Sequence, residues 1–77
     1  MIEEVAITSD YIKLDAFLKF AGLAETGGHA KILVLDGTVK VGDEICLMRG
    51  KKLYPGDIVE VYGNIYKIVR SGLGEDN

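Results

Sequence analysis

The spacing of apolar residues changes at Gly37, from a helical period to a strand period. Between Leu14 and Gly37, apolar side chains recur three and four residues apart, as on one face of an α-helix; they are Leu14, Phe17, Leu18 and Ala21, then Ala30, Leu33 and Val34. After Gly37 they alternate, as in half-buried strands. A chain of 77 residues has room for one small core, which both kinds of element must share. The sequence therefore predicts a single α+β domain over residues 1–77, with two short helices packed on a small, mostly antiparallel sheet of four to five strands.

Capping residues delimit the two helices. Gly22 follows the first apolar stripe and is positioned to end the first helix. Thr26 is the predicted N-cap of the second helix, which Gly37 closes.

Gly27 and Gly28 stand in the first turn of that second helix, where glycine is unfavourable by up to about 1 kcal/mol per residue. Two interpretations are open. Either the backbone needs a positive φ or close packing here, or a helix start without side chains lets its N–H groups approach a phosphate.

The expected strands follow from alternation and turn signals. They comprise residues 2–8 with Val5 and Ile7 on one face, 38–41, a return strand with Ile45 and Leu47, 58–62 and 65–69. Gly42-Asp43 and Gly63-Asn64 are the predicted tight turns, and Tyr54-Pro55-Gly56-Asp57 matches a type II turn. Cys46 is expected to face away from the core. Residues 48–54 have no clear period and form a predicted loop, and residues 71–77 form a predicted frayed tail.

Positive charge is concentrated in the middle of an acidic chain. The formal net charge is −3, yet residues 13–52 hold seven Lys or Arg against five Asp or Glu. Within that stretch lies the basic run, Arg49-Gly50-Lys51-Lys52. A local basic patch on an acidic protein indicates a polyanionic partner that is bound by one face.

Several classes of function are disfavoured. One cysteine and one histidine cannot form an internal disulfide or a zinc site, and no catalytic or phosphate-loop motif occurs. We therefore expect a non-enzymatic protein without a cofactor or metal. The start of the chain lacks the features of a signal peptide, and no apolar stretch approaches the roughly 20 residues that span a bilayer. A cytoplasmic protein without membrane contact is expected.

Spaced residues from Ile12 to Val61 resemble the S4 RNA-binding domain, also called the αL motif. The resemblance is carried by Lys13-Leu14-Asp15 with Phe17-Leu18, by Gly22-Leu23-Ala24 and Thr26, by Ala30 and Leu33 with Asp36-Gly37-Thr38-Val39-Lys40-Val41, and by Pro55-Gly56-Asp57-Ile58-Val59-Glu60-Val61. It implies an αL-type fold with a core over residues 12–62 and an extra C-terminal strand over residues 63–70. Gly27 stands where many members have arginine, and Gly42-Asp43 where many have Asn-Gly. The segment from Thr26 to Lys31 and the basic run resemble small bacterial members that consist of this domain alone.

The resemblance implies a protein that holds structured RNA, ribosomal RNA or tRNA, by shape and phosphate contacts. Ribosome assembly or translation is the implied role, with ribosomal particles as further partners and a monomer as the expected state. The implied RNA-binding residues are Lys13, Thr26, Gly27, Gly28, His29, Lys31, Lys40, Arg49, Lys51 and Lys52. Tyr54, Tyr62 and Tyr66 either stack on bases or pack in strands, and Tyr11 is a candidate packing residue. The alternative function is a protein-interaction adaptor that uses the acidic surface or a sheet edge.

Overall fold

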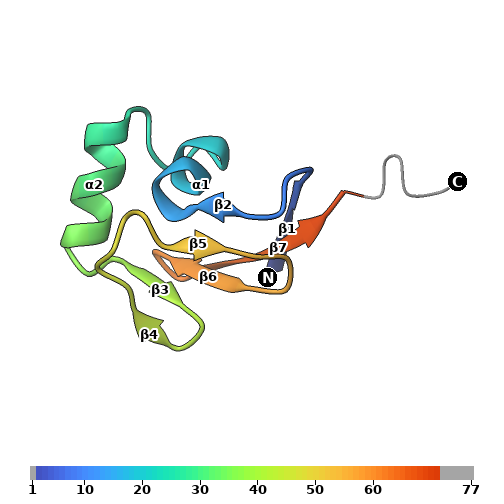
Figure 1. Ribbon diagram of the computed structural model, residues 1–77. Helices are drawn as coiled ribbons and strands as arrows, with labels where there is room; N and C mark the ends of the chain where they lie inside the picture. Colours follow the sequence, from blue (N-terminus) through green and yellow to red (C-terminus); the bar gives the residue numbers. More distant parts are fainter. Residues whose placement is uncertain (1, 72–77) are drawn as a thin grey trace, which may run out of the picture.

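The computed structural model describes residues 2–71, and its elements confirm the predicted α+β class (Figure 1). The helices are α1 (Leu14–Phe20) and α2 (Gly27–Leu35). The strands are β1 (Ile2–Ile7), β2 (Ile12–Lys13), β3 (Val39–Val41), β4 (Glu44–Ile45), β5 (Lys52–Leu53), β6 (Ile58–Val61) and β7 (Asn64–Arg70). Of the predicted frayed tail, residues 72–77 lie outside the described part, whereas the Ser71 N–H donates to the Ile7 carbonyl over 2.8 Å.

Five strands form one mixed sheet in the order β1-β7-β6-β3-β4. The pairing of β1 with β7 is parallel, and the other three pairings are antiparallel. This agrees with the predicted small, mostly antiparallel sheet. β2 and β5 make a separate antiparallel pair, which the sequence did not predict because each strand has only two residues.

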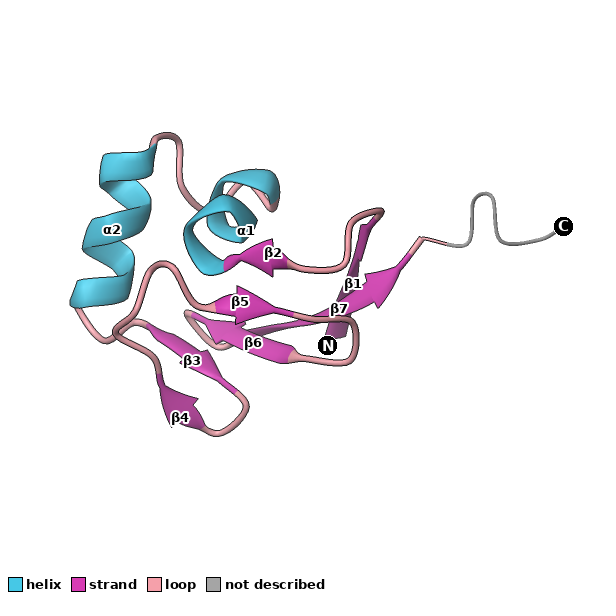
Figure 2. Ribbon diagram, viewed as in Figure 1, coloured by secondary structure: helices cyan, strands magenta, loops and turns pink. Residues whose placement is uncertain are grey.

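The core lies between one face of the five-stranded sheet and the two helices, which Figure 2 shows on the same side of that sheet. Its fully buried large side chains are Phe17, Leu14, Leu18, Leu53, Ile68, Val34, Val39, Val59 and Val61. Phe17 of α1 meets Tyr66 of β7 edge-on, with ring centroids 5.7 Å apart. Leu53 joins the short β2/β5 pair to this core.

Glycine ends both helices, as predicted. Gly22 has a φ of +78° and donates its N–H to the Lys19 carbonyl, while Leu23 donates to Leu18. The φ of Gly37 is also +78°, and the same bonding pattern closes α2. Both ends are Schellman motifs, in which a residue without a side chain adopts the left-handed conformation.

The prediction that Cys46 faces away from the core is wrong. Lys40 pairs with Ile45 across the β3/β4 hairpin, and both side chains are exposed. The next residue, Cys46, therefore turns inward: its N–H donates to the Val39 carbonyl over 2.9 Å, and it packs against the core. β4 also ends at Ile45, so Leu47 is not part of a return strand.

The last hairpin turn is displaced by one residue from the predicted Gly63-Asn64. Val61 pairs with Asn64, so Tyr62 and Gly63 form the two-residue turn. Both have a positive φ, +54° for Tyr62 and +80° for Gly63, as a type I′ turn requires. Tyrosine is uncommon in this conformation, which is why the sequence favoured the wrong pair. The predicted type II turn is confirmed, with Gly56 at a φ of +101°.

Candidate nucleic-acid interface

The basic run closes the N-terminal end of α1 with its backbone. The Leu14 N–H donates to the Lys51 carbonyl over 2.8 Å, and the Asp15 N–H donates to the Arg49 carbonyl over 2.9 Å. Lys13, the N-cap residue of α1, makes no side-chain capping bond. The first N–H groups of a helix have no partner within it. The basic run supplies these partners and is therefore held against α1 rather than extending freely from the domain.

Two lysines lie directly opposite each other on the β2/β5 pair. Lys13 pairs with Lys52, and the adjacent Ile12 pairs with Leu53. Since Leu53 is buried and Ile12 packs on the core, alternation places both lysine side chains on the solvent face. Like charges in opposite positions destabilise a strand pair.

Neither lysine forms an ion pair with a carboxylate in the described part of the chain. Among residues 2–71 one ion pair forms, between Arg70 and Asp10 at 3.8 Å, and it involves neither lysine. Lys13 and the basic run together place four cationic side chains around the start of α1. Such a cluster fits a polyanion.

Two tyrosines continue the solvent face of the β2/β5 pair. Tyr11 precedes β2 and Tyr54 follows β5, and their ring centroids lie 5.9 Å apart. The Lys52 Nζ atom lies 4.8 Å from the centre of the Tyr11 ring. We call these residues, Tyr11, Lys13, Lys52 and Tyr54, the tyrosine–lysine face. The sequence did not reveal this face, because residues 11–13 and 52–54 are too few to show a recognisable alternation.

Thr26 caps α2, as predicted. Its Oγ1 atom accepts the His29 N–H over 3.1 Å, and the Nδ1 atom of His29 accepts the Glu25 N–H over 3.3 Å. The histidine imidazole thus bonds to the backbone before the helix, one residue earlier than the N-cap N–H that a capping box uses. This gives His29 a structural role in addition to any contact with RNA.

Neither packing nor a positive φ explains the paired glycines of α2. Their φ values are not positive, and an added Cβ would meet nothing within 4 Å at Gly27 and only the Thr26 Oγ1 atom, at 3.9 Å, at Gly28. The first of the two sequence-based interpretations is therefore wrong. The open space leaves the first turn of α2 accessible.

Replacing both glycines by alanine should separate stability from binding. We expect Gly27→Ala with Gly28→Ala to raise the free energy of unfolding by up to about 1 kcal/mol per residue, because alanine favours the helix. RNA affinity should fall, because the added methyl groups cover the helix start. Thermal unfolding and RNA titration measure the two effects. A stabilised variant with unchanged affinity would show that phosphate does not approach this turn.

A hollow of about 170 Å³ lies between α1 and the start of α2. It is lined by Asp15, Ala16, Lys19 and Gly27. Because the Asp15 N–H bonds to the Arg49 carbonyl, the hollow adjoins the basic run. Lys31 lies one turn after Gly27 along α2 and is exposed. The predicted residues of both helices thus flank one region.

Lys40 lies apart from this region. It sits opposite Glu60 and Ile45 in the sheet, between Val39 and Val41, whose side chains turn toward the core. Its side chain therefore projects from the outer face of the sheet, away from the helices. The basic face that we consider below consists of Lys13, Lys31, Arg49, Lys51 and Lys52.

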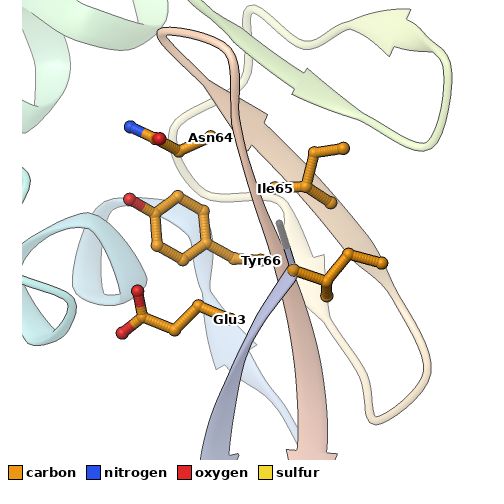
Figure 3. A pocket seen from close by; sticks show the side chains of 5 residues that line it. Glu3, Asn64, Ile65 and Tyr66 are labelled. Carbon is orange, nitrogen blue, oxygen red and sulfur yellow. The ribbon is translucent and has the colours of Figure 1, made fainter.

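Another hollow lies at β1 and β7 and does not form an enclosed site. It has a volume of about 490 Å³ and is lined by Ile2, Glu3, Asn64, Ile65 and Tyr66. Figure 3 shows Glu3, Asn64 and Tyr66 on one side of the strands and Ile65 on the other. Its lining holds a single carboxylate and no histidine or cysteine. In the described part of the chain, neither helix has the length and hydrophobicity to cross a membrane.

Comparison with known proteins shows the family to which the chain belongs. The chain matches the pattern of the S4 domain over residues 5–69. It is also 41% identical, over 63 residues, to a protein of Bacillus subtilis (strain 168) named "Probable ribosome maturation protein RlbA". The matched region covers 82% of this chain and 89% of that protein. The resemblance inferred from spaced residues is thereby confirmed: the chain belongs to the S4 domain family of RNA-binding proteins.

Proposed function

We propose that this protein binds structured ribosomal RNA with its basic face and acts in ribosome maturation without catalysing a reaction. The observation that carries the proposal is the group of four cations around the start of α1, none of which forms an ion pair with a carboxylate within residues 2–71. The printed name of the similar Bacillus subtilis protein supports the choice of process. We further propose that the protein acts as a cytoplasmic monomer.

The chemistry of the basic face suits backbone phosphates. Arg49 can bind one phosphate with two parallel N–H groups, whereas the lysines act as point charges. The backbone N–H groups at Gly27 and Gly28 offer a further anion contact at the start of a nine-residue helix. Such contacts recognise the shape of a folded RNA more than its sequence.

Salt dependence tests the proposal. If about four phosphates are engaged, the logarithm of the association constant should fall with the logarithm of salt concentration at a slope near −3. That amounts to almost two decades of affinity between about 50 and 200 mM salt. Fluorescence anisotropy with purified ribosomal RNA provides the measurement, and poly(U) of similar length is the unstructured comparison. An affinity that stays flat over this range would contradict the proposal.

The adaptor hypothesis is favoured by the outer edge of β1, a six-residue strand that pairs on one side only. Such an edge can accept a strand from another protein. Affinity capture from a lysate, with and without ribonuclease, distinguishes the two functions. An RNA-binding protein loses its ribosomal partners when the RNA is digested, whereas an adaptor keeps them.

A further inference from the structure

We propose that the tyrosine–lysine face binds one unpaired nucleotide of the RNA, with the base stacked on Tyr54 and the phosphate near Lys13 and Lys52. This inference rests on the proposed function and adds to it the class of RNA that is preferred. The ligand would be a helix that carries a bulged or looped-out base, held at the β2/β5 end of the basic face. The contacts of these four residues support each step.

The two rings and the two ammonium groups share one surface. Continuing the register of Ile12 with Leu53 sets Tyr11 opposite Tyr54, and alternation turns both rings to the same side as the lysines. The rings are tilted by 51°, so they do not stack face to face and cover each other. Aromatic rings interleaved with cations on a strand surface are the arrangement that proteins use for unpaired nucleotides.

The exposure of Tyr54 distinguishes it from a packing residue. Its exposed fraction is 48%, against 6% for Tyr66, which is packed edge-on against Phe17. The Lys52 ammonium group lies over the ring of Tyr11, which is the neighbour of Tyr54. A base stacked on Tyr54 would therefore have a cation beside it for its phosphate.

The backbone around Tyr54 is held in place before any ligand arrives. The Tyr54 N–H donates to Asp57 Oδ2 over 2.8 Å, and the Gly56 N–H donates to the Ile68 carbonyl over 2.7 Å. These bonds fix the type II turn to β7. On the other strand, the Tyr11 carbonyl accepts the Ser9 hydroxyl over 2.8 Å. Because little ordering remains to be done, more of the stacking energy is available for binding.

The two opposed lysines favour binding of an anion to the tyrosine–lysine face. Lys13 and Lys52 repel each other in the free protein, as described above. A phosphate near both would replace this repulsion with two favourable contacts. A merely structural pair of tyrosines would not need two lysines without ion-pair partners beside it.

A short RNA hairpin with a single bulged 2-aminopurine tests the inference, with the fully paired hairpin as its comparison. We expect the wild type to prefer the bulged RNA and to change the fluorescence of its 2-aminopurine. Tyr54→Ala should weaken binding to the bulged RNA by about 5- to 150-fold, the range of one base stack, and should leave the paired RNA unaffected. Tyr54→Phe should behave as the wild type, because it keeps the ring.

Control variants separate this inference from the proposed function. Tyr62→Ala removes another exposed tyrosine, in the β6/β7 turn, and should change nothing. Tyr54→Leu keeps apolar bulk without a ring, so it replaces the alanine variant if that variant does not fold. It should show the same selective loss of binding to the bulged RNA. Equal binding of both RNAs by wild type and Tyr54→Ala would overturn the inference and leave the proposed function standing. Failure of the wild type to bind either RNA would overturn both.

Discussion

Replacing Leu53 by alanine is expected to lower the free energy of unfolding by about 2–5 kcal/mol. Leu53 is fully buried, and it is the residue of β5 that reaches the core. A domain with a stability of roughly 0.05–0.15 kcal/mol per residue cannot lose this amount without a large change in its folded fraction. The effect should also reach the basic run, because Leu53 directly follows Lys52 and anchors it.

Thermal unfolding followed by circular dichroism measures this loss. The melting temperature should fall by about 4–8 °C for each kcal/mol in a domain of this size. Leu47→Ala is the matched control, because Leu47 has an exposed fraction of 56% and should lose less than about 0.5 kcal/mol. If the two leucine variants unfold at the same temperature, the β2/β5 pair is not docked on the core as described.

Reversing two charges of the basic run should have the largest effect on binding. We expect Lys51→Glu with Lys52→Glu to weaken binding of ribosomal RNA at least about tenfold at low salt, and to reduce the salt slope from near −3 to about −1.5. Two of about four phosphate contacts would be lost. Anisotropy titrations at several salt concentrations measure both quantities.

The melting temperature of this double variant should change little. The basic run holds α1 through backbone carbonyls, which the substitutions keep. Loss of the Lys52 contact with the Tyr11 ring, about 0.5–1 kcal/mol at an exposed site, is opposed by removal of the Lys13–Lys52 repulsion. A collapsed fold would instead assign these side chains a structural role.

Lys40→Glu with Lys67→Glu is the matched control for charge. Both lysines are exposed, and their register places them on the outer face of the sheet. The control changes the net charge by the same amount as the test variant. Its salt slope should stay near that of the wild type. An equal loss of affinity would show that net charge, and not the basic face, governs binding, or that Lys40 contacts RNA.

Elements governed by local rules could be predicted from the sequence. Gly22 and Gly37 end their helices because a residue without a side chain adopts the left-handed conformation there. Thr26 caps α2 through its own hydroxyl group, which accepts the N–H of His29, three residues later. Each of these signals depends on residues within one helical turn. Such signals can therefore be recognised in the sequence without knowledge of the rest of the fold.

Elements created by distant pairing could not be predicted in the same way. β2 and β5 have two residues each, too few for a recognisable period, and they exist because Ile12 meets Leu53. The inward position of Cys46 likewise follows from the register of β4 against β3. The turn at Tyr62 follows from the pairing of Val61 with Asn64, which overrides the poor fit of tyrosine to a positive φ.

In the candidate site, too, local features could be predicted from the sequence, and contacts between distant segments could not. The charge count and the family resemblance identified the basic run and Lys13, and the structure brings them together at the start of α1. It sets Lys40 on a different face. The proximity of Tyr11 and Tyr54 could not be predicted, because it depends on the β2/β5 pair.

The attachment of the basic run to α1 also bears on how this surface can evolve. The two bonds that hold it use the carbonyls of Arg49 and Lys51, which every amino acid provides. Mutations at these positions can therefore alter the charge and shape presented to a ligand while the helix remains capped. In the proposed complex the side chains of these residues contact the ligand, and their backbone carbonyls stabilise the fold. Relatives can therefore diverge in the RNA they bind while the fold is kept.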